Sequence, residues 1–332
     1  MKQKYCLLAM SLFSFVLTVG CTKEQETVNG LETVDDVCSK MDDVVFKRYC
    51  IEHYDYNHDG KISMDEAELI TEINFSEESI HDIVSLKGME YMTNLRKLKC
   101  GGNKLTTIDL SHNTNITILY CGNNKLDVLD VSKLTQLQVL WCNANNLTSL
   151  DVSNNPDLKD LTCYSNHITS LDVSNNKQLT ELSCHANNIT TLDLRGATAL
   201  ESVLCNNPNL TSLDASGLTK LKYLTCYESA LTTIDVSGCT NLRQICCQKN
   251  HLATLNLNSC HSLYSLLCQE NNLTTLDVSM CDLANSQTTY VPLRCAMSSL
   301  QTLYLKSGWS INHITYNRSS EYISPNTQIV YK

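Results

Sequence analysis

The chain lacks several features that would place it in common functional classes. The chain has 332 residues, and after residue 20 it contains no apolar run long enough to cross a membrane. It has no excess of basic charge, since 25 lysines and arginines stand against 35 aspartates and glutamates, and such an acidic chain is a poor partner for nucleic acid. No hydrolase motif, phosphate-binding loop or histidine-rich metal site is present, so the sequence offers no catalytic residue and predicts no enzyme.

The one long apolar stretch lies at the N-terminus. Residues 1–20 begin with lysines and continue as an apolar run, which predicts an export signal peptide. The signal ends on Gly-Cys, and Cys21 in this place resembles the lipobox cysteine of bacterial lipoproteins, which becomes lipidated. Thr18 stands where that motif prefers Leu or Val, and the alternative is ordinary secretion with Cys21 as a free thiol. Residues 21–34 are polar and acidic, which predicts a tether.

An internal repeat of twenty-one residues dominates the rest of the chain. Nine rows of the pattern LxxLxCxxNxLTxLDVSxxxx run from Leu95 to about Leu283. Five aliphatic columns make one continuous core, and a period of this length is typical of a solenoid. The stretch LxxLxCxxN matches the leucine-rich-repeat consensus, with cysteine in place of a leucine. The predicted fold is a leucine-rich-repeat solenoid, a right-handed superhelix with a curved parallel β-sheet and an irregular or 3-10 convex side.

Each row carries a cysteine whose role could be disulfide pairing, metal binding or packing. In a short strand, the leucine and cysteine of L-x-C point inward. Sulfurs on adjacent strands would then lie about 4.8 Å apart, whereas a disulfide needs about 2 Å and zinc needs four ligands around it. We therefore expect buried, inert thiols. The column consists of Cys100, Cys121, Cys142, Cys163, Cys184, Cys205, Cys226, Cys247 and Cys268.

The repeat resembles that of the cysteine-ladder internalins, a bacterial surface leucine-rich-repeat family, and of similar proteins carried by gut Bacteroidetes. The resemblance covers about residues 86–283 and rests on the period, the cysteine column and the LDVS turn. It implies binding or adhesion at the cell surface without catalysis, and it does not identify the ligand.

Two polar columns accompany the cysteines. Asparagine follows the cysteine by three positions in seven rows and resembles the family's asparagine ladder, which bonds the backbone of adjacent turns; it breaks at Pro208 and Ser229. An aspartate column in the LDVS turn could form a calcium site, but aspartate before serine more often caps local backbone N–H groups. This column consists of Asp109, Asp130, Asp151, Asp172, Asp193, Asp214, Asp235 and Asp277.

A calcium-binding motif precedes the repeats. The stretch DYNHDGKISMDE at residues 55–66 fits the twelve-residue EF-hand loop, with oxygen ligands at the required spacing and glycine at the sharp turn. The alternative is a metal-free turn between two helices, which we expect within residues 41–54 and 64–73. The predicted Ca²⁺ ligands are Asp55, Asn57, Asp59, Lys61 through its carbonyl, Ser63 through a water, and Glu66.

A solenoid exposes its core at both ends, so caps are expected there. Residues 35–72 contain the calcium loop and are predicted to form an α-helical N-terminal cap that calcium stabilises. Residues 73–283 are assigned to the repeats, and residues 284–332, which alternate as short strands and turns, to a β-rich C-terminal cap. Whether Cys38 and Cys50 pair in the N-terminal cap is left open.

The residues on either side of the inward cysteines face the concave sheet surface. They include aromatic and apolar side chains although the chain is only 6% aromatic, which suits a protein hot spot or stacking against sugar rings. The alternative is that strands simply favour aromatics. Cys246 is also expected to face outward and to be the most reactive thiol of the repeats. The predicted ligand-binding residues are Tyr120, Trp141, Tyr164, His185, Leu204, Tyr223, Tyr227 and Leu267.

These features together predict a lipid-anchored, non-enzymatic protein of the bacterial outer membrane or cell surface that binds a protein or glycan. The stretch TKEQE after Cys21 resembles surface-export signals of Bacteroidetes lipoproteins and favours an extracellular-facing position. A structural or scaffolding lipoprotein of the envelope is the second interpretation. A hydrolase is a distant third, since Cys184 and His185 are adjacent on a strand and point to opposite faces.

Overall fold

The computed structural model divides the chain into two compact units, Met1–Val34 and Asp35–Lys332. In the first unit, β1 (Thr27–Val28) and β2 (Leu31–Glu32) pair in antiparallel fashion. The predicted signal peptide, Cys21 and most of the predicted tether lie outside the described residues. Within the described part of the chain, no helix has the length and apolar character needed to cross a membrane. The structure describes residues 27–28, 31–32, 34–75, 80–283, 292–311 and 322–332.

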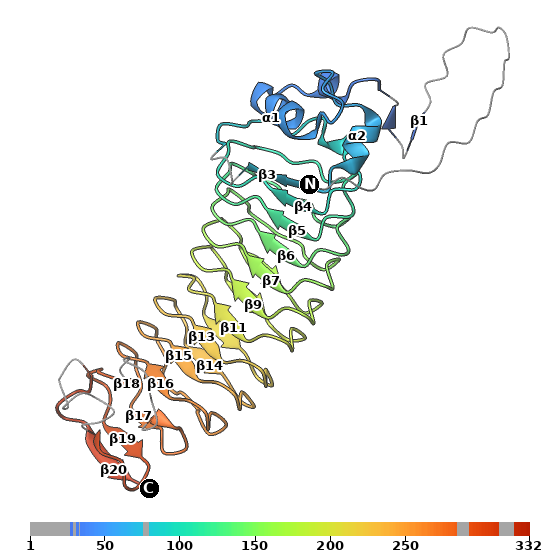
Figure 1. Ribbon diagram of the computed structural model, residues 1–332. Coiled ribbons are helices and arrows are strands. Elements are labelled where there is room, and N and C mark those ends of the chain that lie inside the picture. The colour runs from blue at the N-terminus through green and yellow to red at the C-terminus, as the bar shows by residue number, and fades with distance from the viewer. Residues whose placement is uncertain (1–26, 29–30, 33, 76–79, 284–291, 312–321) are drawn as a thin grey trace, which may run out of the picture. The chain divides into compact units, whose positions relative to one another are not determined.

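The second unit is built on a parallel sheet of eleven short strands, stacked like the rungs of a ladder (Figure 1). From β4 to β16 each strand pairs with its equivalent one repeat further along. The strands are β3 (Glu72–Asn74), β4 (Lys97–Lys99), β5 (Ile118–Tyr120), β6 (Val139–Trp141), β7 (Asp160–Thr162), β9 (Glu181–Ser183), β11 (Ser202–Leu204), β13 (Tyr223–Thr225), β15 (Gln244–Cys246), β16 (Ser265–Leu267) and β18 (Leu293–Arg294).

These strands are short because the repeat alternates inward and outward residues over only a few positions. From β4 to β16 the central residue of each strand, such as Leu140 in β6, is buried, and the cysteine two residues further on is buried as well. The cysteine N–H groups continue the ladder; for example, Cys121 N donates to the carbonyl oxygen of Trp141 at 2.8 Å. The aliphatic columns thus form one core that runs through all the turns.

The LDV segments form further strands, which add a second strand position to several repeats. Inward leucine and outward aspartate alternate there with the period of a strand. The strands β8 and β10 pair in parallel, as do β12 and β14, while β17, β19 and β20 form a three-stranded sheet near the C-terminus. Their bounds are β8 (Ser170–Asp172), β10 (Thr191–Asp193), β12 (Ser212–Asp214), β14 (Thr233–Asp235), β17 (Thr275–Asp277), β19 (Thr302–Leu305) and β20 (Gln328–Tyr331).

The N-terminal part of the second unit is helical, as the sequence predicts. Asp43 caps α1 (Val44–Tyr54) by accepting from Val45 N and Phe46 N, and a capping box of Ser63 and Glu66 begins α2 (Met64–Leu69). Short 3-10 helices, η1 (Val37–Lys40) and η3 (Met89–Tyr91), flank this region.

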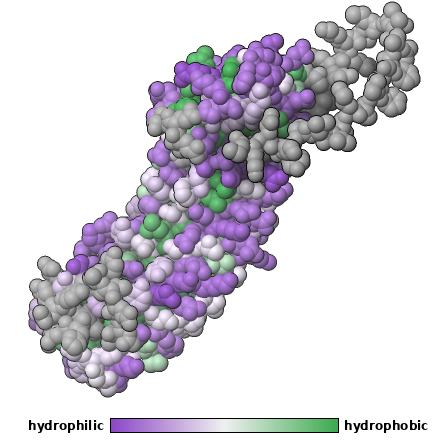
Figure 2. Space-filling model, viewed as in Figure 1, coloured by the Kyte–Doolittle hydropathy of each residue, from purple (hydrophilic) through white to green (hydrophobic). Residues whose placement is uncertain are grey.

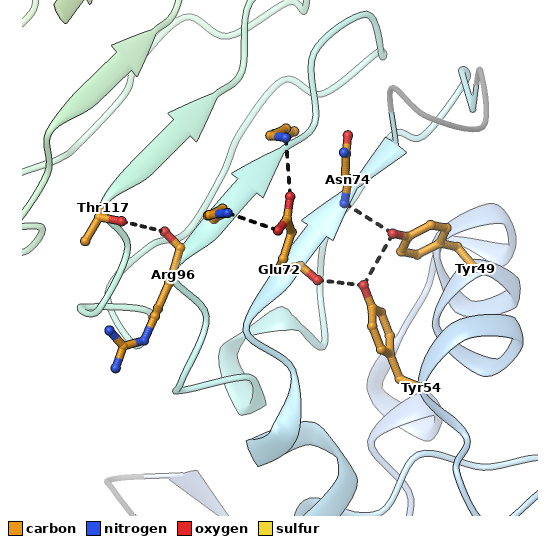
Figure 3. Close-up of polar contacts among 8 residues, drawn as sticks. Tyr49, Tyr54, Glu72, Asn74, Arg96 and Thr117 are labelled. Atoms are coloured by element: carbon orange, nitrogen blue, oxygen red, sulfur yellow. Dashed lines mark hydrogen bonds and ion pairs between the residues drawn. The ribbon is translucent and has the colours of Figure 1, made fainter. Parts of the chain in front are cut away.

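Hydrogen bonds join the helices to the first strand of the sheet (Figure 3). The Tyr54 hydroxyl donates to the carbonyl oxygen of Glu72 at 2.6 Å, and Asn74 N donates to the Tyr49 hydroxyl at 3.2 Å. Phe75, next to β3, is fully buried and packs edge-on against Phe46 and Tyr49. Because β3 pairs with β4, the helical region is continuous with the stacked core.

Candidate functional site

The nine ladder cysteines are packing residues, as predicted. All are fully buried and none is paired. Burial raises the pKa of Cys163 to about 12, so the thiolate needed for metal binding or nucleophilic attack does not form near neutral pH. Cys38 and Cys50, whose pairing was open, are also buried and free.

The prediction that Cys246 faces outward is confirmed, and it is the most exposed of the described cysteines, although it is still largely buried. Cys246 does occupy an outward position of β15, but only 9% of it is exposed. Thr225 and Leu267 flank it in register, and Gln244 Nε2 donates to its sulfur at 3.5 Å. Burial raises its pKa, so it has neither the exposure nor the thiolate character of a reactive cysteine.

The asparagine ladder is present and is more complete than the sequence indicates. Asn166 is typical: its Nδ2 donates to the carbonyl oxygens of Cys142 and Cys163, and its Oδ1 accepts from Leu147 N. Where Pro208 interrupts the column, Asn207 donates to the carbonyl oxygens of Cys184 and Cys205 instead. Ser229, which occupies the column itself, then accepts from Asn207 N, so the break is bridged by one side chain out of register and one in register.

A second set of buried asparagines was missed by the sequence analysis. Asn113, Asn155 and Asn176 are fully buried at equivalent positions in the turns before the sheet strands. Asn155 Nδ2, for example, donates to the carbonyl oxygens of Val131 and Leu134 at 3.0 and 2.8 Å. Their spacing of twenty-one and forty-two residues was the signal that could have found them.

The aspartate column caps local backbone, which favours the structural interpretation over a calcium site. Asp151 Oδ1 accepts from Ser153 N at 2.9 Å, and the other members make the same bond two residues along. The hydroxyl and N–H of Ser153 lower the pKa of Asp151. In the row without aspartate, Asn256 Oδ1 accepts from Asn258 N at 3.1 Å, so the turn needs an acceptor and not a charge.

The predicted calcium loop folds as a compact turn with its ligand side chains on backbone N–H groups. Asp55 Oδ2 accepts from Gly60 N at 2.8 Å, and Asp59 Oδ1 accepts from Lys61 N at 2.9 Å. Gly60 has φ +81°, which favours glycine at the sharp turn. Asn57 Oδ1 accepts from Asp59 N at 2.8 Å, so three of the predicted ligands line the same turn.

Glu66 closes the loop across its two ends. Its Oε1 accepts from Tyr56 N at 2.9 Å and its Oε2 accepts from Ser63 N at 2.9 Å. Burial opposes its ionisation, but the bonds from Ser63, Asn57 and Tyr56 outweigh it and lower its pKa. Within the described residues, no three His, Cys, Asp or Glu side chains are gathered closely enough to hold a metal. The loop side chains nevertheless carry oxygen atoms, which are the ligands that Ca²⁺ prefers. In this structure their carboxylates accept hydrogen bonds from backbone N–H groups of the loop.

We call the outward side of the eleven-stranded sheet the sheet face; it is the surface that the sequence analysis expects to be concave. In the view of Figure 2 the surface is largely hydrophilic, with small hydrophobic areas among polar side chains. Most predicted ligand-binding residues on it are partly exposed, and Trp141 and Tyr223 reach 39% and 37%.

The structure brings the predicted aromatic residues together in two pairs. The rings of Tyr120 and Trp141 are stacked with centroids 4.2 Å apart and planes 11° apart. The rings of Tyr164 and His185 are stacked at 4.5 Å and 16°. Lys99 lies 6.0 Å from the centroid of the Tyr120 ring, on the strand preceding it.

The other four predicted residues do not join these pairs. Leu204 lies between Ser183 and Thr225 in register, and Leu267 lies beside Cys246. Tyr223 lies on β13, in register with Ser202 and Gln244. Tyr227 is half-buried just past β13. They are spread along the C-terminal half of the sheet.

Four further residues of the sheet face lie next to the aromatic pairs and were missed. Ile118 and Val139 share β5 and β6 with Tyr120 and Trp141, and Asp160 and Glu181 continue their column on β7 and β9. The signal was the other outward position of each strand, from which the sequence analysis took only Tyr223. Partial burial, together with the nearby carboxylates Asp160 and Glu201, raises the pKa of Glu181.

Comparison with known proteins identifies the architecture. No family model and no curated protein matches the chain. Among solved structures, it is similar to the functional domain of InlJ from Listeria monocytogenes, which includes a cysteine ladder, at 32% identity and a TM-score of 0.71. The match covers 89% of this chain and 63% of that domain, so this chain spans less than two thirds of its relative's length. The fold is a leucine-rich-repeat solenoid.

Two more distant structures show the same leucine-rich-repeat fold. An internalin (inlF) from Listeria monocytogenes is 20% identical, with 89% of this chain and 96% of that chain covered and a TM-score of 0.54. The ectodomain of the plant receptor kinase GASSHO1/SCHENGEN3 from Arabidopsis thaliana, in complex with CASPARIAN STRIP INTEGRITY FACTOR 2, is 18% identical, with 82% and 37% covered and a TM-score of 0.60. The predicted fold class is thus confirmed, and leucine-rich-repeat solenoids are scaffolds with extended binding surfaces.

Proposed function

We propose that this leucine-rich-repeat protein is a non-enzymatic binding protein of the bacterial cell surface that recognises a protein or glycan through its sheet face. The observation that carries the proposal is the exposed aromatic group on β5 and β6, where Trp141 is 39% exposed and stacked on Tyr120. Large aromatic side chains held on a rigid, partly apolar surface are typical of binding hot spots.

Three further observations support binding over catalysis. The thiols of the ladder are buried with raised pKa values, which removes them as nucleophiles. The InlJ domain shares the cysteine ladder, and the plant receptor ectodomain was solved with a protein ligand. A solenoid with a packed interior and exposed aromatic side chains on its sheet face is suited to binding a ligand.

Anchoring and calcium belong to the same proposal. Cys21 is the residue that a lipoprotein signal would make available for lipidation. Asp55, Asn57, Asp59, the carbonyl of Lys61, Ser63 through a water, and Glu66 would hold Ca²⁺ in the N-terminal cap. Bound calcium would neutralise the carboxylates and fix the loop. Ile62, inside this loop, is fully buried, and its carbonyl oxygen accepts from Val37 N at 2.7 Å, which ties the loop to η1.

The test is a binding screen of residues 22–332, with calcium present, against host matrix proteins and a glycan array. We expect at least one ligand that loses about tenfold or more in affinity with Trp141→Ala, and with Tyr120→Ala, at unchanged secondary structure. Ligands indifferent to both substitutions would remove the sheet face as the binding site. Surface labelling of intact cells separates the alternatives, because a periplasmic scaffold would be protected from an impermeant reagent.

A further inference from the structure

Two neighbouring carboxylates face outward in the middle of the sheet face. Asp160 on β7 and Glu181 on β9 are in register, and equivalent side chains on adjacent strands lie about 5 Å apart. The ion pairs formed by described residues involve other carboxylates, such as Glu201, which Lys222 approaches to 2.6 Å. Like charges opposite one another destabilise a sheet, so a cationic ligand would relieve this repulsion.

The acidic pair adjoins an apolar patch. Val139 precedes Asp160 in the same column, and Ile118 precedes Val139. The indole N–H of Trp141 donates to Asp160 Oδ2 at 2.9 Å, so this carboxylate is held at the border of the patch. Thr162 Oγ1 also donates to Asp160 Oδ1 at 3.4 Å. An apolar anchor and two carboxylates that form no ion pair with a described residue therefore lie side by side on β5 to β9.

The aromatic rings present their edges to a ligand. Tyr120 and Trp141 belong to adjacent strands and stack nearly parallel at 4.2 Å, which requires the ring planes to stand across the direction of strand stacking. Their faces point along the stack, where Trp141 and Lys99 lie against Tyr120. A sugar ring binds best against an open aromatic face, so this arrangement favours a protein ligand, which can pack side chains against ring edges.

We propose that the sheet face binds a basic segment of a protein partner. An arginine or lysine of that segment pairs with Asp160 and Glu181, and an apolar side chain about two strands away packs on Ile118, Val139 and Trp141. The formal charge of the whole chain, −10, adds a general attraction for such a partner. This inference rests on the proposed function, since it specifies the ligand of the same face.

The test uses a displayed library of random dodecapeptides panned against residues 22–332. Enriched peptides are synthesised, and their dissociation constants are measured by fluorescence polarisation. Three variants are compared with the natural chain: the double variant Asp160→Asn/Glu181→Gln, the charge-matched control Asp127→Asn/Asp157→Asn, and Trp141→Ala. The control removes two exposed carboxylates that lie outside the eleven-stranded sheet.

We expect enriched peptides to carry arginine or lysine near an apolar residue. Their dissociation constants should rise about tenfold or more in the double variant and in Trp141→Ala, and less than about twofold in the control. Affinity should also fall between about 50 and about 500 mM NaCl, because screening weakens charge pairing.

Other outcomes overturn the inference in distinguishable ways. Peptides that need Trp141 but lack basic residues, or that ignore the double variant, would contradict the cationic partner and leave the proposed function intact. Binding that ignores Trp141→Ala as well would contradict both. A Trp141-dependent glycan without any peptide, or a calcium ion lost in the double variant, would assign the acidic pair to another ligand.

Discussion

At the scale of single residues, the repeat works by pairing inward backbone groups with buried asparagine side chains. Cysteine fits the ladder because its thiol is small and apolar. Asparagine forms hydrogen bonds with backbone groups that the turns leave unpaired. The Nδ2 and Oδ1 atoms of Asn166 together reach three backbone groups. Because inward residues fill these roles, the outward residues of the sheet face can differ from one repeat to the next.

The ladder cysteines should be unreactive in the folded protein. Each is fully buried, and burial raises the pKa of Cys163 to about 12, so the thiolate is absent near neutral pH. Ellman's reagent should label none of the ladder thiols at pH 8, and in denaturant it should label all sixteen cysteines of the second unit. Oxidised ladder cysteines, or rapid labelling under native conditions, would contradict the packing role.

Removal of an asparagine from the ladder should destabilise the solenoid. The substitution Asn166→Ala leaves the buried N–H of Leu147 without its acceptor and removes one of the two asparagine donors from the carbonyl oxygens of Cys142 and Cys163, which costs about 1–3 kcal/mol. The exposed Asn154→Ala is the matched control and should change stability by less than about 0.5 kcal/mol. Urea unfolding at pH 7 measures both, and equal stabilities would argue against the ladder's role.

At the scale of elements, two kinds of turn are held by carboxylates: the LDVS turn of each repeat and the predicted calcium loop. Both turn carboxylates toward backbone N–H groups, as Asp151 and Asp55 show. In the LDVS turn Asn256 does the same without charge. In the predicted calcium loop, Asp55, Asp59 and Glu66 all accept from backbone N–H groups, and a cation bound by their oxygens would add stability.

The LDVS turns should make stability depend on acidic pH. Hydrogen bonds from Ser153 lower the pKa of Asp151 below its unfolded value, so the folded state binds protons less readily. This contribution is fully present above about pH 4, the unfolded pKa, and is lost as the pH falls through the folded pKa. Asp151→Asn should match the natural chain at pH 7 and lose less stability at pH 3 in urea unfolding; an unchanged pH profile would contradict this.

Calcium should stabilise the N-terminal cap through the predicted loop. At a calcium concentration about 100-fold above Kd, we expect the melting temperature to rise by about 5 °C relative to EDTA. Asp55→Ala or Glu66→Gln should abolish the rise, while Glu68→Gln, an exposed acid of α2, should retain it. A melting temperature indifferent to calcium would mean that the loop is a metal-free turn.

At the scale of the whole molecule, the sequence determines the solenoid more fully than it determines the face. The fold and the inward direction of Cys163 were predictable because a period of twenty-one and the alternation of a strand fix which residues are inside. The outward position of Cys246 was predictable, but its burial was not, because that burial depends on Thr225 and Leu267, which belong to other repeats. The Asn207 bridge was missed because it lies one residue out of the column.

The candidate site was predictable only in part, for a related reason. The positions of Tyr120 and Trp141 follow from the repeat, but the stacking of their rings depends on side-chain rotation, which the pattern does not specify. Asp160 and Glu181 lay in the second outward column and were open to the same reasoning. The face thus combines residues that the sequence identifies with contacts that only the structure shows.

The central claim is that binding takes place on the sheet face and nowhere else on the solenoid. Its most direct test is the dissociation constant of one screened ligand for Trp141→Ala beside Val128→Ala, which trims a side chain that is 74% exposed outside the eleven-stranded sheet. We predict a loss of about tenfold or more for Trp141→Ala and less than about twofold for Val128→Ala. Equal affinities, or a larger loss at Val128, would contradict the account.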